Sequence, residues 1–368
     1  MSATDPPFRA EQVGSLLRPA AVLEARGAVA AGTRSPAELR AVEDEAIAAA
    51  VARVEDLGLR SVTDGEFRRA WFHLDFLQQL DGVAVTGHIP SSSDSASTVH
   101  MTPPTLSVVG PLRHERDIQV ADFRYLASVT TQTPKVSIPS PTMVHFRGGR
   151  AAIDIHAYPD LEPFFADLAA CYRAELAALY AAGCRYVQLD DTNLAYLCDP
   201  VMRAGAEARG DDPDALPHAY AELINACIAD RPADLVVGIH LCRGNYRSTW
   251  FAAGGYEPVA EVLFSELAVD AFFLEYDDER SGDFGPLRHV RPDTSVVLGL
   301  VTSKRPELES FDLLAQRVDE AAAYVPLDQL CLSPQCGFAS TVEGNALTED
   351  EQWAKLRLVV DSAQRIWR

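Results

Sequence analysis

Two residues that could bind a metal stand two positions apart at the end of an apolar segment. Residues 235–239 read Leu-Val-Val-Gly-Ile, and His240 and Cys242 follow closely. In a strand, side chains i and i+2 point to the same face, so this imidazole and thiol would lie side by side. Such a pair supplies half of a tetrahedral zinc site. Short metal motifs also occur by chance, and the pair alone equally fits a buried cysteine beside a histidine satisfied by a backbone carbonyl.

Two further apolar segments end in residues that can complete such a site. Residues 271–274 precede Glu275, with Asp277 two positions later on the same face, and residues 330–335 precede Cys336. In a parallel α/β barrel the carboxyl ends of the strands meet at one mouth, where ligands and catalytic groups gather. We therefore predict one zinc ion bound by four side chains, His240, Cys242, Glu275 and Cys336, with Asp277 as the competitor of Glu275.

The order of these residues resembles the catalytic domain of cobalamin-independent methionine synthase. The shared pattern is H-x-C at 240–242, an apolar strand that ends in Glu275, and P-x-C-G at 334–337. The wider match begins at residues 13–16, Val-Gly-Ser-Leu, and covers nearly the whole chain. It is closer to the shorter single-barrel relatives, such as the zinc-dependent epoxyalkane:coenzyme M transferase, than to the two-barrel enzyme. The resemblance implies zinc-dependent methyl transfer to homocysteine from a methyltetrahydrofolate-type donor.

The resemblance also implies three residues that bind the amino-acid end of homocysteine. Glu66 matches the glutamate of the family's H-G-E motif, although Asp64 replaces the histidine. Asp190 matches the aspartate of I-Q-I-D-E-P, and Ser15 lies in the Val-Gly-Ser-Leu segment. Two carboxylates suit an ammonium group, and the neighbouring Asp191 is expected to cap a helix.

One segment departs from the family pattern. The large enzyme has a D-x-H-S-P segment whose histidine is thought to protonate the leaving nitrogen of the methyl donor, and residues 299–306 put Lys304 in its place. A lysine with a pKa of about 10.4 is a poor general acid at neutral pH unless its surroundings lower that pKa. We predict that Lys304 is a catalytic residue that orients or neutralises an anionic donor. The alternative is a solvated loop lysine.

The charge of the predicted zinc site favours thiol chemistry. Two thiolates and a carboxylate outweigh the charge of a divalent ion, so the site is less suited than a neutral-ligand site to activating water. It can still bind a substrate thiol as thiolate, because coordination deprotonates a thiol. A free thiol with a pKa of about 8.5 is only a few per cent ionised at neutral pH. The pattern therefore predicts alkyl transfer to a thiol.

Three alternatives remain open from the sequence. A sulfonate thiol such as coenzyme M would need arginines, and Arg18, Arg68, Arg69 and Arg243 are candidates. A metal-free barrel of the uroporphyrinogen decarboxylase type would make the histidine and cysteines incidental. A non-enzymatic barrel with a closed structural zinc site would admit no substrate.

Alternating strands and helices predict a parallel sheet in the form of a (β/α)8 TIM barrel, with a doubly wound sheet as the second choice. The sequence offers one strand more than a barrel needs, so one must lie outside. We expect a single domain over 1–368, with a serine-rich hairpin or loop excursion at about 83–104. A first strand and loop are predicted over 13–19, with Ser15 at the end of the strand. The other candidate strands cover 59–66, 106–110, 135–139 and 185–191 and begin again at 235, 272, 296 and 330.

Helix signals are clear at several places. Ser35 and Glu38 form a capping box around Pro36, and Gly58 predicts the end of that helix after residue 57. Further helices are predicted over 161–182 and from Thr348, where a second capping box begins. Aromatic and leucine residues at helical spacing predict another helix over 71–80.

Composition restricts the class of protein. The net charge of −21 argues against nucleic acid as a partner, because phosphate would be repelled. No apolar run approaches the roughly 20 residues of a membrane span, and the first residues lack a signal-peptide pattern. Seven cysteines without disulfide-like spacing predict a reducing, cytoplasmic location. The expected partners are a small-molecule thiol and a methyl donor, and the sequence does not indicate the oligomeric state.

Overall fold

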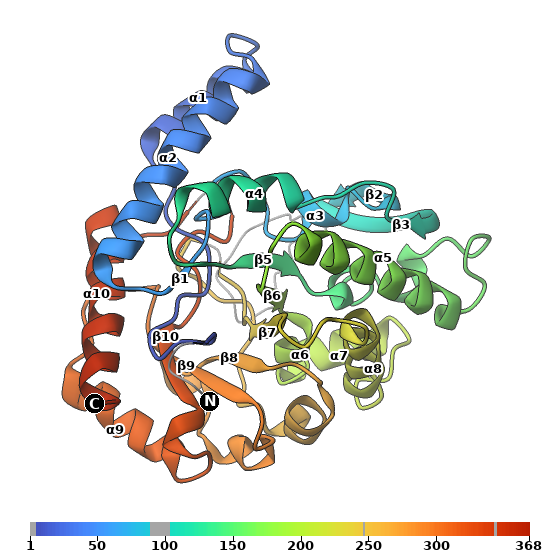
Figure 1. Ribbon diagram of the computed structural model, residues 1–368. Coiled ribbons are helices and arrows are strands. Elements are labelled where there is room, and N and C mark those ends of the chain that lie inside the picture. The colour runs from blue at the N-terminus through green and yellow to red at the C-terminus, as the bar shows by residue number, and fades with distance from the viewer. Residues whose placement is uncertain (1–4, 89–103, 246, 342–343) are drawn as a thin grey trace.

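The computed structural model describes residues 5–88, 104–245, 247–341 and 344–368 and is built around a parallel sheet (Figure 1). The six strands lie side by side in the reverse of their sequence order, so a crossover segment joins each strand to the next. From one edge to the other they are β10 (Leu330–Pro334), β9 (Ser295–Val301), β8 (Ala271–Glu275), β7 (Val236–Leu241), β6 (Tyr186–Asp191) and β5 (Val136–Pro139).

Shorter pairings extend this sheet into the predicted (β/α)8 barrel. β1 (Ser61–Val62) pairs in parallel with β4 (Thr133–Pro134), which directly precedes β5. On the other side, Ala10 forms a parallel bridge with Leu332 of β10, and Leu16 N donates to Gly65 O. The segment around Ala10 thus lies between β10 and β1 and takes the place of the first strand.

The first predicted strand, which was to begin at Val13 and end at Ser15, is wrong in its position. The ladder contact lies earlier, at Ala10, and the later residues turn across the end of the barrel. There Ser15 O accepts a hydrogen bond from Phe338 N, and Arg18 donates to the carbonyl of Glu66. These contacts to loops replace the ladder that a regular strand would need.

The strand in excess is the one predicted at 106–110. It belongs to β3 (Pro104–Arg113), which pairs in antiparallel fashion with β2 (Asp81–His88) outside the barrel (Figure 1). The predicted excursion over 83–104 therefore includes parts of both strands of a hairpin. Its central part, 89–103, lies outside the described residues.

Helices cover the barrel, and the predicted capping signals are confirmed. In α2 (Pro36–Leu57), Ser35 and Glu38 form the reciprocal capping box, and Gly58 ends the helix in a left-handed conformation. Thr348 and Glu351 do the same for the final helix. The other helices are α1 (Ala20–Ala30), α3 (Leu74–Leu77), α4 (Val120–Val129), α5 (Leu161–Ala181), α6 (Asn193–Tyr196), α7 (Pro200–Ala208), α8 (Leu216–Ile228), α9 (Phe311–Ala322) and α10 (Glu349–Ile366).

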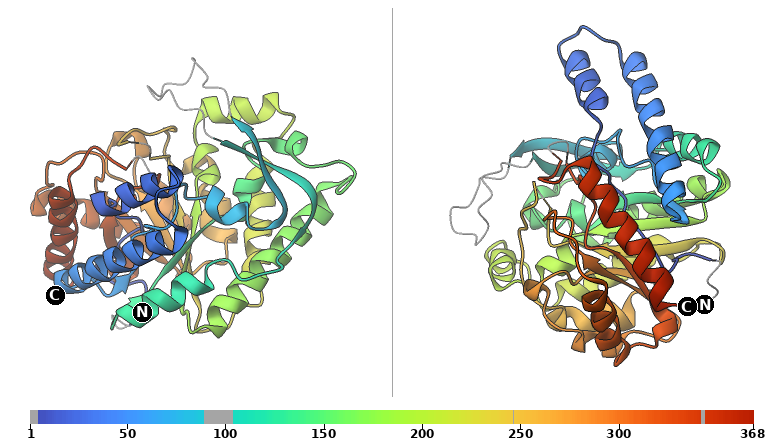
Figure 2. Two further views of the ribbon diagram at one scale, coloured as in Figure 1. Left: turned by 90° about the horizontal axis from the view of Figure 1, so that it is seen from above. Right: turned by 90° about the vertical axis from the view of Figure 1, so that its left-hand side faces the viewer.

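A helical hairpin projects from one side of the barrel. α1 and the first part of α2 extend beyond the other elements, as Figure 1 and the right-hand view of Figure 2 show. Residues 30–38, at the tip, are exposed throughout. Sequence reasoning predicted α2 and did not predict α1.

The helix predicted over 71–80 is wrong in its extent, since only Leu74–Leu77 are α-helical. The Asp75 carboxylate accepts hydrogen bonds from the backbone N–H groups of Ala70 and Trp71. Trp71 also forms a bridge with Thr341. These contacts bind the preceding residues into a turn, so the aromatic spacing reflects packing on a loop.

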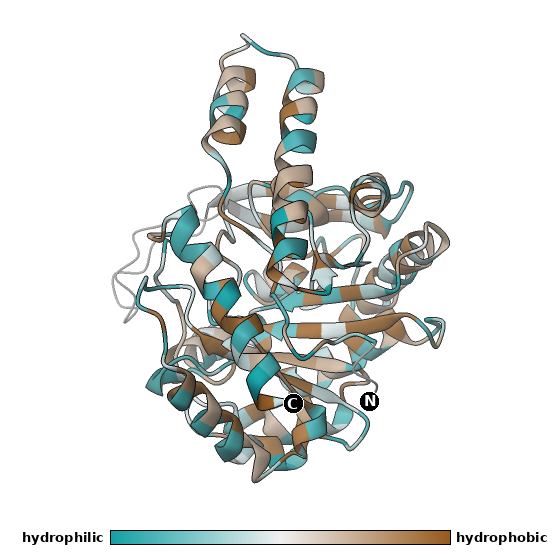
Figure 3. Cartoon of the chain, turned by 60° about the vertical axis from the view of Figure 1, so that its left-hand side comes forward, coloured by the Kyte–Doolittle hydropathy of each residue, from teal (hydrophilic) through white to brown (hydrophobic). Residues whose placement is uncertain are grey.

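The core follows the strands, and Figure 3 shows hydrophobic residues on the central strands against a largely hydrophilic outer face of α10. Inside the barrel, Lys135 Nζ lies 3.6 Å from the Glu11 carboxylate, and both side chains are buried. Five cysteines outside the predicted zinc site are buried and form no disulfide: Cys171, Cys184, Cys198, Cys227 and Cys331. Within the described residues, no helix combines the length and the apolarity that a bilayer span requires.

Candidate functional site

The four predicted metal ligands meet at the mouth of the barrel. His240 lies in β7, Cys242 directly follows this strand, Glu275 ends β8, and Cys336 follows β10. All four are buried, and one candidate ligand atom of each lies within 4.8 Å of those of the other three. The ends of three strands of the sheet, β7, β8 and β10, thus bring together the set that the strand-end argument predicted.

Several buried polar atoms of this cluster have no hydrogen-bond partner in the described part of the chain and could coordinate a metal ion. In the described part of the chain, neither ring nitrogen of His240 has a hydrogen-bond partner, nor does Glu275 Oε2. The sulfurs of Cys242 and Cys336 are 3.5 Å apart. Buried polar atoms without partners are rare and costly, and a coordinated ion would satisfy them. A nitrogen, two sulfurs and a carboxylate oxygen form a donor set typical of zinc.

A hydrogen bond joins the two cysteine thiols and shifts their pKa values in opposite directions. The pKa of the Cys336 thiol is held well below its usual range, chiefly because the Cys242 thiol donates a hydrogen bond to it. The same contact raises the pKa of Cys242. Gly244 N also donates to Cys242 Sγ, at 3.2 Å. The pair therefore presents one thiolate readily and a second sulfur that also receives a backbone hydrogen bond.

The structure distinguishes Glu275 from its competitor Asp277. Glu275 joins the cluster, and its Oε1 accepts a hydrogen bond from Arg243 N at 3.2 Å. Asp277 is not part of the cluster and pairs with Arg280 at 3.0 Å, the guanidinium that also lies 3.6 Å from Glu275 Oε2. Burial raises the pKa of Asp277 to about 6. Its carboxylate is thus committed to an ion pair beside the cluster.

Glu66 and Asp190 lie close enough to share one cation, and the protein supplies it. The Arg69 guanidinium contacts the Glu66 carboxylate and lies 3.8 Å from Asp190 Oδ2. Burial raises the pKa of Glu66 to about 8, and Arg69 opposes that shift. The pKa of Asp190 is raised as well, again by burial first. The two predicted substrate-binding acids therefore surround an arginine.

Glu66 is held in an unusual backbone conformation. Its φ is 56°, in the left-handed region that costs a residue with a side chain about 1–3 kcal/mol. Glu66 N donates to Asp64 Oδ1 at 2.8 Å, and Arg18 donates to Glu66 O at 3.0 Å. A side chain at Gly14 would collide with the Glu66 carboxylate. Asp64, the departure from the family's histidine, thus stabilises the turn that aims Glu66.

Asp190 is positioned by a chain of hydrogen bonds from the barrel interior. Gln188 Nε2 donates to Asp190 Oδ1 at 2.8 Å, and Lys135 Nζ donates to Gln188 Oε1 at 3.1 Å. The neighbouring Asp191 caps α6 as predicted, since its Oδ1 accepts from Leu194 N at 2.8 Å. The two adjacent aspartates therefore have different roles.

Ser15 lies against the loop that carries Cys336. Its Oγ accepts a hydrogen bond from Ala339 N at 3.1 Å. A Cβ at Gly337 would collide with this hydroxyl, so the glycine allows the close approach of the two segments. Ser15, Glu66, Asp190 and three of the four cluster residues line one pocket of about 50 Å³, which we call the central pocket.

A family model that describes the catalytic domain of cobalamin-independent synthases matches residues 8–365. The chain belongs to this family. Two relatives from Bacillus subtilis, the uncharacterized proteins YxjH and YxjG, are each 48% identical to it. The alignments cover 98% and 99% of the chain and 95% and 96% of the relatives.

Other members of the cobalamin-independent synthase family are more distant. A 5-methyltetrahydropteroyltriglutamate–homocysteine methyltransferase from Thermosynechococcus vestitus is 24% identical over 92% of the chain, which spans 41% of that enzyme. A solved candidate vitamin-B12-independent methionine synthase from Listeria monocytogenes is 40% identical, with a TM-score of 0.79 and 99% of both chains covered. A B12-independent methionine synthase from Shewanella, solved with selenomethionine, is 20% identical with a TM-score of 0.74 over 98% and 97% of the chains. It supports the fold.

Lys304 of this family member does not lie on a solvated surface. It is buried, and its Nζ donates to the carbonyls of Gly244 and Thr249 at 3.4 and 3.5 Å. These carbonyls belong to the loop that follows the cluster residue Cys242. Lys304 therefore contacts the metal-site loop, and its predicted role toward a donor stays a prediction.

The four arginines considered for a sulfonate are already engaged. Arg18 donates to backbone carbonyls, Arg68 lies among three aspartates, and Arg69 contacts Glu66. Arg243 is fully buried and donates to Tyr256 and Gly254. Sequence reasoning overlooked a different arginine, Arg147, which lines the central pocket. No local sequence pattern distinguishes this side chain.

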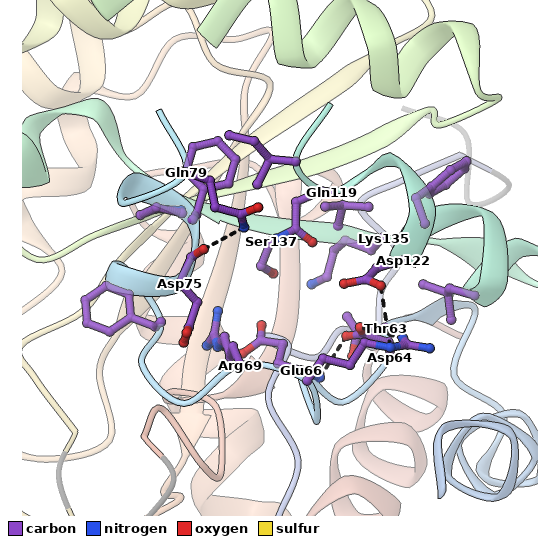
Figure 4. Close-up of a pocket in the computed structure, with 18 of the residues that line it drawn as sticks. Thr63, Asp64, Glu66, Arg69, Asp75, Gln79, Gln119, Asp122, Lys135 and Ser137 are labelled. Atoms are coloured by element: carbon purple, nitrogen blue, oxygen red, sulfur yellow. Dashed lines mark hydrogen bonds and ion pairs between the residues drawn. The ribbon is translucent and has the colours of Figure 1, made fainter. Parts of the chain in front are cut away.

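A second cavity of about 280 Å³, which we call the side chamber, lies beside the central pocket. Glu66, Arg69 and Phe72 line both cavities, so Arg69 stands at their boundary. Figure 4 shows the polar groups around the side chamber, with Asp75 and Gln79 on one side and Asp64 and Asp122 on another.

Proposed function

We propose that this protein catalyses zinc-dependent methyl transfer to a thiol, with homocysteine as acceptor and a methyltetrahydrofolate-type molecule as donor. The observation that carries the proposal is the buried cluster of His240, Cys242, Glu275 and Cys336, three of which line one pocket with the two carboxylates of Glu66 and Asp190. Sulfur chemistry at one end and ammonium recognition at the other describe an amino-acid thiol. Family membership supports the reaction class.

The four cluster residues would hold the zinc ion. When bound, the ion supplies a site at which a substrate thiol loses its proton and stays nucleophilic. The chain's own part is to keep both cysteine sulfurs available and to exclude water. Burial of all four side chains provides that exclusion.

Glu66 and Asp190 recognise the ammonium group of the acceptor, and Ser15 lies beside them. In the structure the Arg69 guanidinium lies between these acids, so a substrate ammonium must replace it. The side chamber gives Arg69 space behind its present position, close to the acids Asp64 and Asp75. Substrate binding then exchanges one cation for another and leaves no carboxylate unpaired, which limits the cost of burial.

In the transfer, the acceptor sulfur attacks the methyl carbon of the donor. A sulfur–carbon bond forms while the bond between that carbon and the donor nitrogen breaks, and the nitrogen gains a proton. Fixing the amino-acid end at Glu66 and Asp190 holds the sulfur in one place, which makes the attack effectively intramolecular.

A sulfonate thiol fits this site less well. It would need a free cation beside Glu66 and Asp190, whereas two carboxylates lie there and Arg69 is already paired with them. The other arginines considered for this role, Arg18, Arg68 and Arg243, are engaged elsewhere. A metal-free decarboxylase leaves the unmet atoms of His240 and Glu275 without explanation.

The test is a matrix of thiols and methyl donors with product mass spectrometry. Zinc-loaded protein should convert homocysteine to methionine with a 5-methyltetrahydrofolate donor, and removal of the metal by a chelator should stop the reaction. Methylation of a simple alkyl thiol in preference to homocysteine would contradict the proposed acceptor. Equal rates with and without zinc would contradict the metal's role.

A further inference from the structure

A charged pair inside the barrel is connected to the central pocket through one side chain. Lys135 and Glu11 are both buried, and Lys135 Nζ lies 3.6 Å from the Glu11 carboxylate. Nζ also donates hydrogen bonds to Gln12 O and, at 3.1 Å, to Gln188 Oε1. Three groups with oxygen atoms thus surround Nζ, and an ammonium group has three N–H donors to match them. Burial lowers the pKa of Lys135, and the charges of Glu11 and Asp190 oppose that shift.

Gln188 joins this ammonium group to Asp190. The glutamine side chain is buried, and its Nε2 donates to Val13 O at 2.7 Å and to Asp190 Oδ1 at 2.8 Å. Both N–H groups of the amide and its oxygen are therefore engaged. The other oxygen of the aspartate, Oδ2, lies 3.8 Å from the Arg69 guanidinium, at the place proposed for the substrate ammonium.

The ammonium group of Lys135 fixes the direction of the Gln188 amide. The oxygen and nitrogen ends of an amide are similar in size, so hydrogen bonds decide which way it points. A reversed amide would set its N–H groups against an ammonium that cannot accept a hydrogen bond. It would also set its oxygen against the carbonyl of Val13 and the carboxylate of Asp190. Buried polar groups left unpaired in this way are costly, so Lys135 keeps a donor directed at Asp190.

We propose that Lys135 is a positioning residue for substrate recognition, because through Gln188 it holds Asp190 Oδ1 and leaves Oδ2 to bind the substrate ammonium. This inference rests on the proposed function, since it takes Asp190 to be a ligand of that ammonium. The role differs from a simple effect of charge. A positive charge inside the barrel repels a nearby ammonium, so its loss alone would tighten binding, whereas loss of the positioning would weaken it.

The test measures ammonium recognition by equilibrium binding, which needs no turnover. Homocysteine and 4-mercaptobutanoic acid carry the same thiol and carboxyl groups and differ only in the amino group. Both are titrated into zinc-loaded protein by calorimetry, and the unmutated protein should prefer homocysteine. Lys135→Met combined with Glu11→Gln removes one charge of each sign, so no carboxylate is left unpaired. It should lower the preference by about 10-fold, while zinc content and binding of 4-mercaptobutanoate persist.

A second variant and a matched control separate positioning from damage to the fold. Gln188→Met leaves the charged pair in place and should lower the preference to the same extent. If thermal melting shows that the double variant does not fold, the result for Gln188→Met decides. Lys355→Met combined with Glu309→Gln replaces another ion pair of a buried lysine, at 3.1 Å, and should leave the preference unchanged.

Three results would overturn the inference. The first is an unmutated protein that binds the two thiols equally well. The second is a preference that persists or increases in the folded variants, and an increase would show that Lys135 acts only through its charge. The third is an equal loss of affinity for both thiols, which would indicate a structural role. Failure of the proposed function has a separate readout, because an unmutated protein that prefers homocysteine and does not methylate it would contradict methyl transfer alone.

Discussion

The two ends of the central pocket are prepared in opposite ways. At the metal end, both ring nitrogens of His240 and the Oε2 atom of Glu275 converge without hydrogen-bond partners in the described part of the chain. At the amino-acid end, Glu66 and Asp190 already surround a cation from the same chain. The metal end is thus complete except for an ion, whereas the amino-acid end is filled and must exchange its occupant.

The difference follows from the elements that carry each end. Strand ends in a barrel are fixed by their neighbours, and His240 is in register with both Asp190 and Phe273. Glu66 instead stands on a turn with a positive φ, and Arg69 follows in a loop. A rigid frame suits a metal with fixed geometry, and a turn suits a group that must admit and release substrate.

The largest effect is expected at the metal end. Cys242→Ser or Cys336→Ser should remove most of an expected one zinc per chain and abolish methyl transfer. Changes to outer partners of metal ligands already cost about 10- to 100-fold in affinity, so loss of a ligand should cost more. Metal analysis after dialysis measures the effect, and Cys331→Ser, at a buried cysteine outside the cluster, is the control. Full zinc in both ligand variants would disprove the four-ligand site.

A smaller effect is expected at the amino-acid end. Asp190→Asn removes one of the two charges that would bind an ammonium group, so the KM for homocysteine should rise by about 10- to 100-fold. The KM for 1-butanethiol, which has no amino group, should change much less. Steady-state kinetics with both thiols measure the ratio. Equal losses would show that Asp190 does not recognise the amino group.

Lys304 contacts the loop that follows Cys242. Its replacement tests whether this loop affects the rate of methyl transfer from the donor. Lys304→Ala should lower methyl transfer by a few-fold while zinc content and homocysteine binding persist, because its contacts are to the carbonyls of Gly244 and Thr249. Lys304→Arg keeps the charge and should retain more activity. A transfer rate unchanged by the alanine variant would remove Lys304 from the mechanism.

The smallest effect concerns pH. Burial raises the pKa of Glu66 to about 8, so below that pH the carboxyl is largely protonated and neutral. Binding of an ammonium group favours the ionised form, and the affinity for homocysteine should therefore increase by a few-fold as pH rises through 8. Comparison with 1-butanethiol at each pH cancels the ionisation of the thiol. A Glu66→Gln protein should lose the difference between the two pH profiles, and an unchanged difference would contradict this assignment.

Much of this site could be predicted from the sequence because its parts obey local rules. Ligands at strand ends require only that strands be recognised, and capping boxes require only residues a few positions apart. The helix predicted over 71–80 was wrong because the Asp75 side chain and the bridge from Trp71 to Thr341 override local spacing. Those contacts involve residues far apart in the sequence.

The same limit explains the two arginines of the pocket. Nothing in the sequence around Arg69 indicates that it lies between Glu66 and Asp190, because the second of these comes from a distant strand. Arg147 likewise comes from a different segment of the chain, and only the assembled structure shows that it lines the same pocket. The balance of charges in a pocket depends on residues that only the tertiary structure brings together.

The helical hairpin of α1 and α2 has a consequence for handling the molecule. Its buried residues are Val22 and Ala25 in α1 and, in α2, residues from Glu43 onward, so the tip contributes nothing to the barrel core. Local opening of the tip would expose little apolar surface, and amide hydrogens there should exchange long before those of the strands. The exposed turn at residues 31–35 is consequently the place where a peptide tag or fluorophore can be inserted with the barrel mouth left untouched.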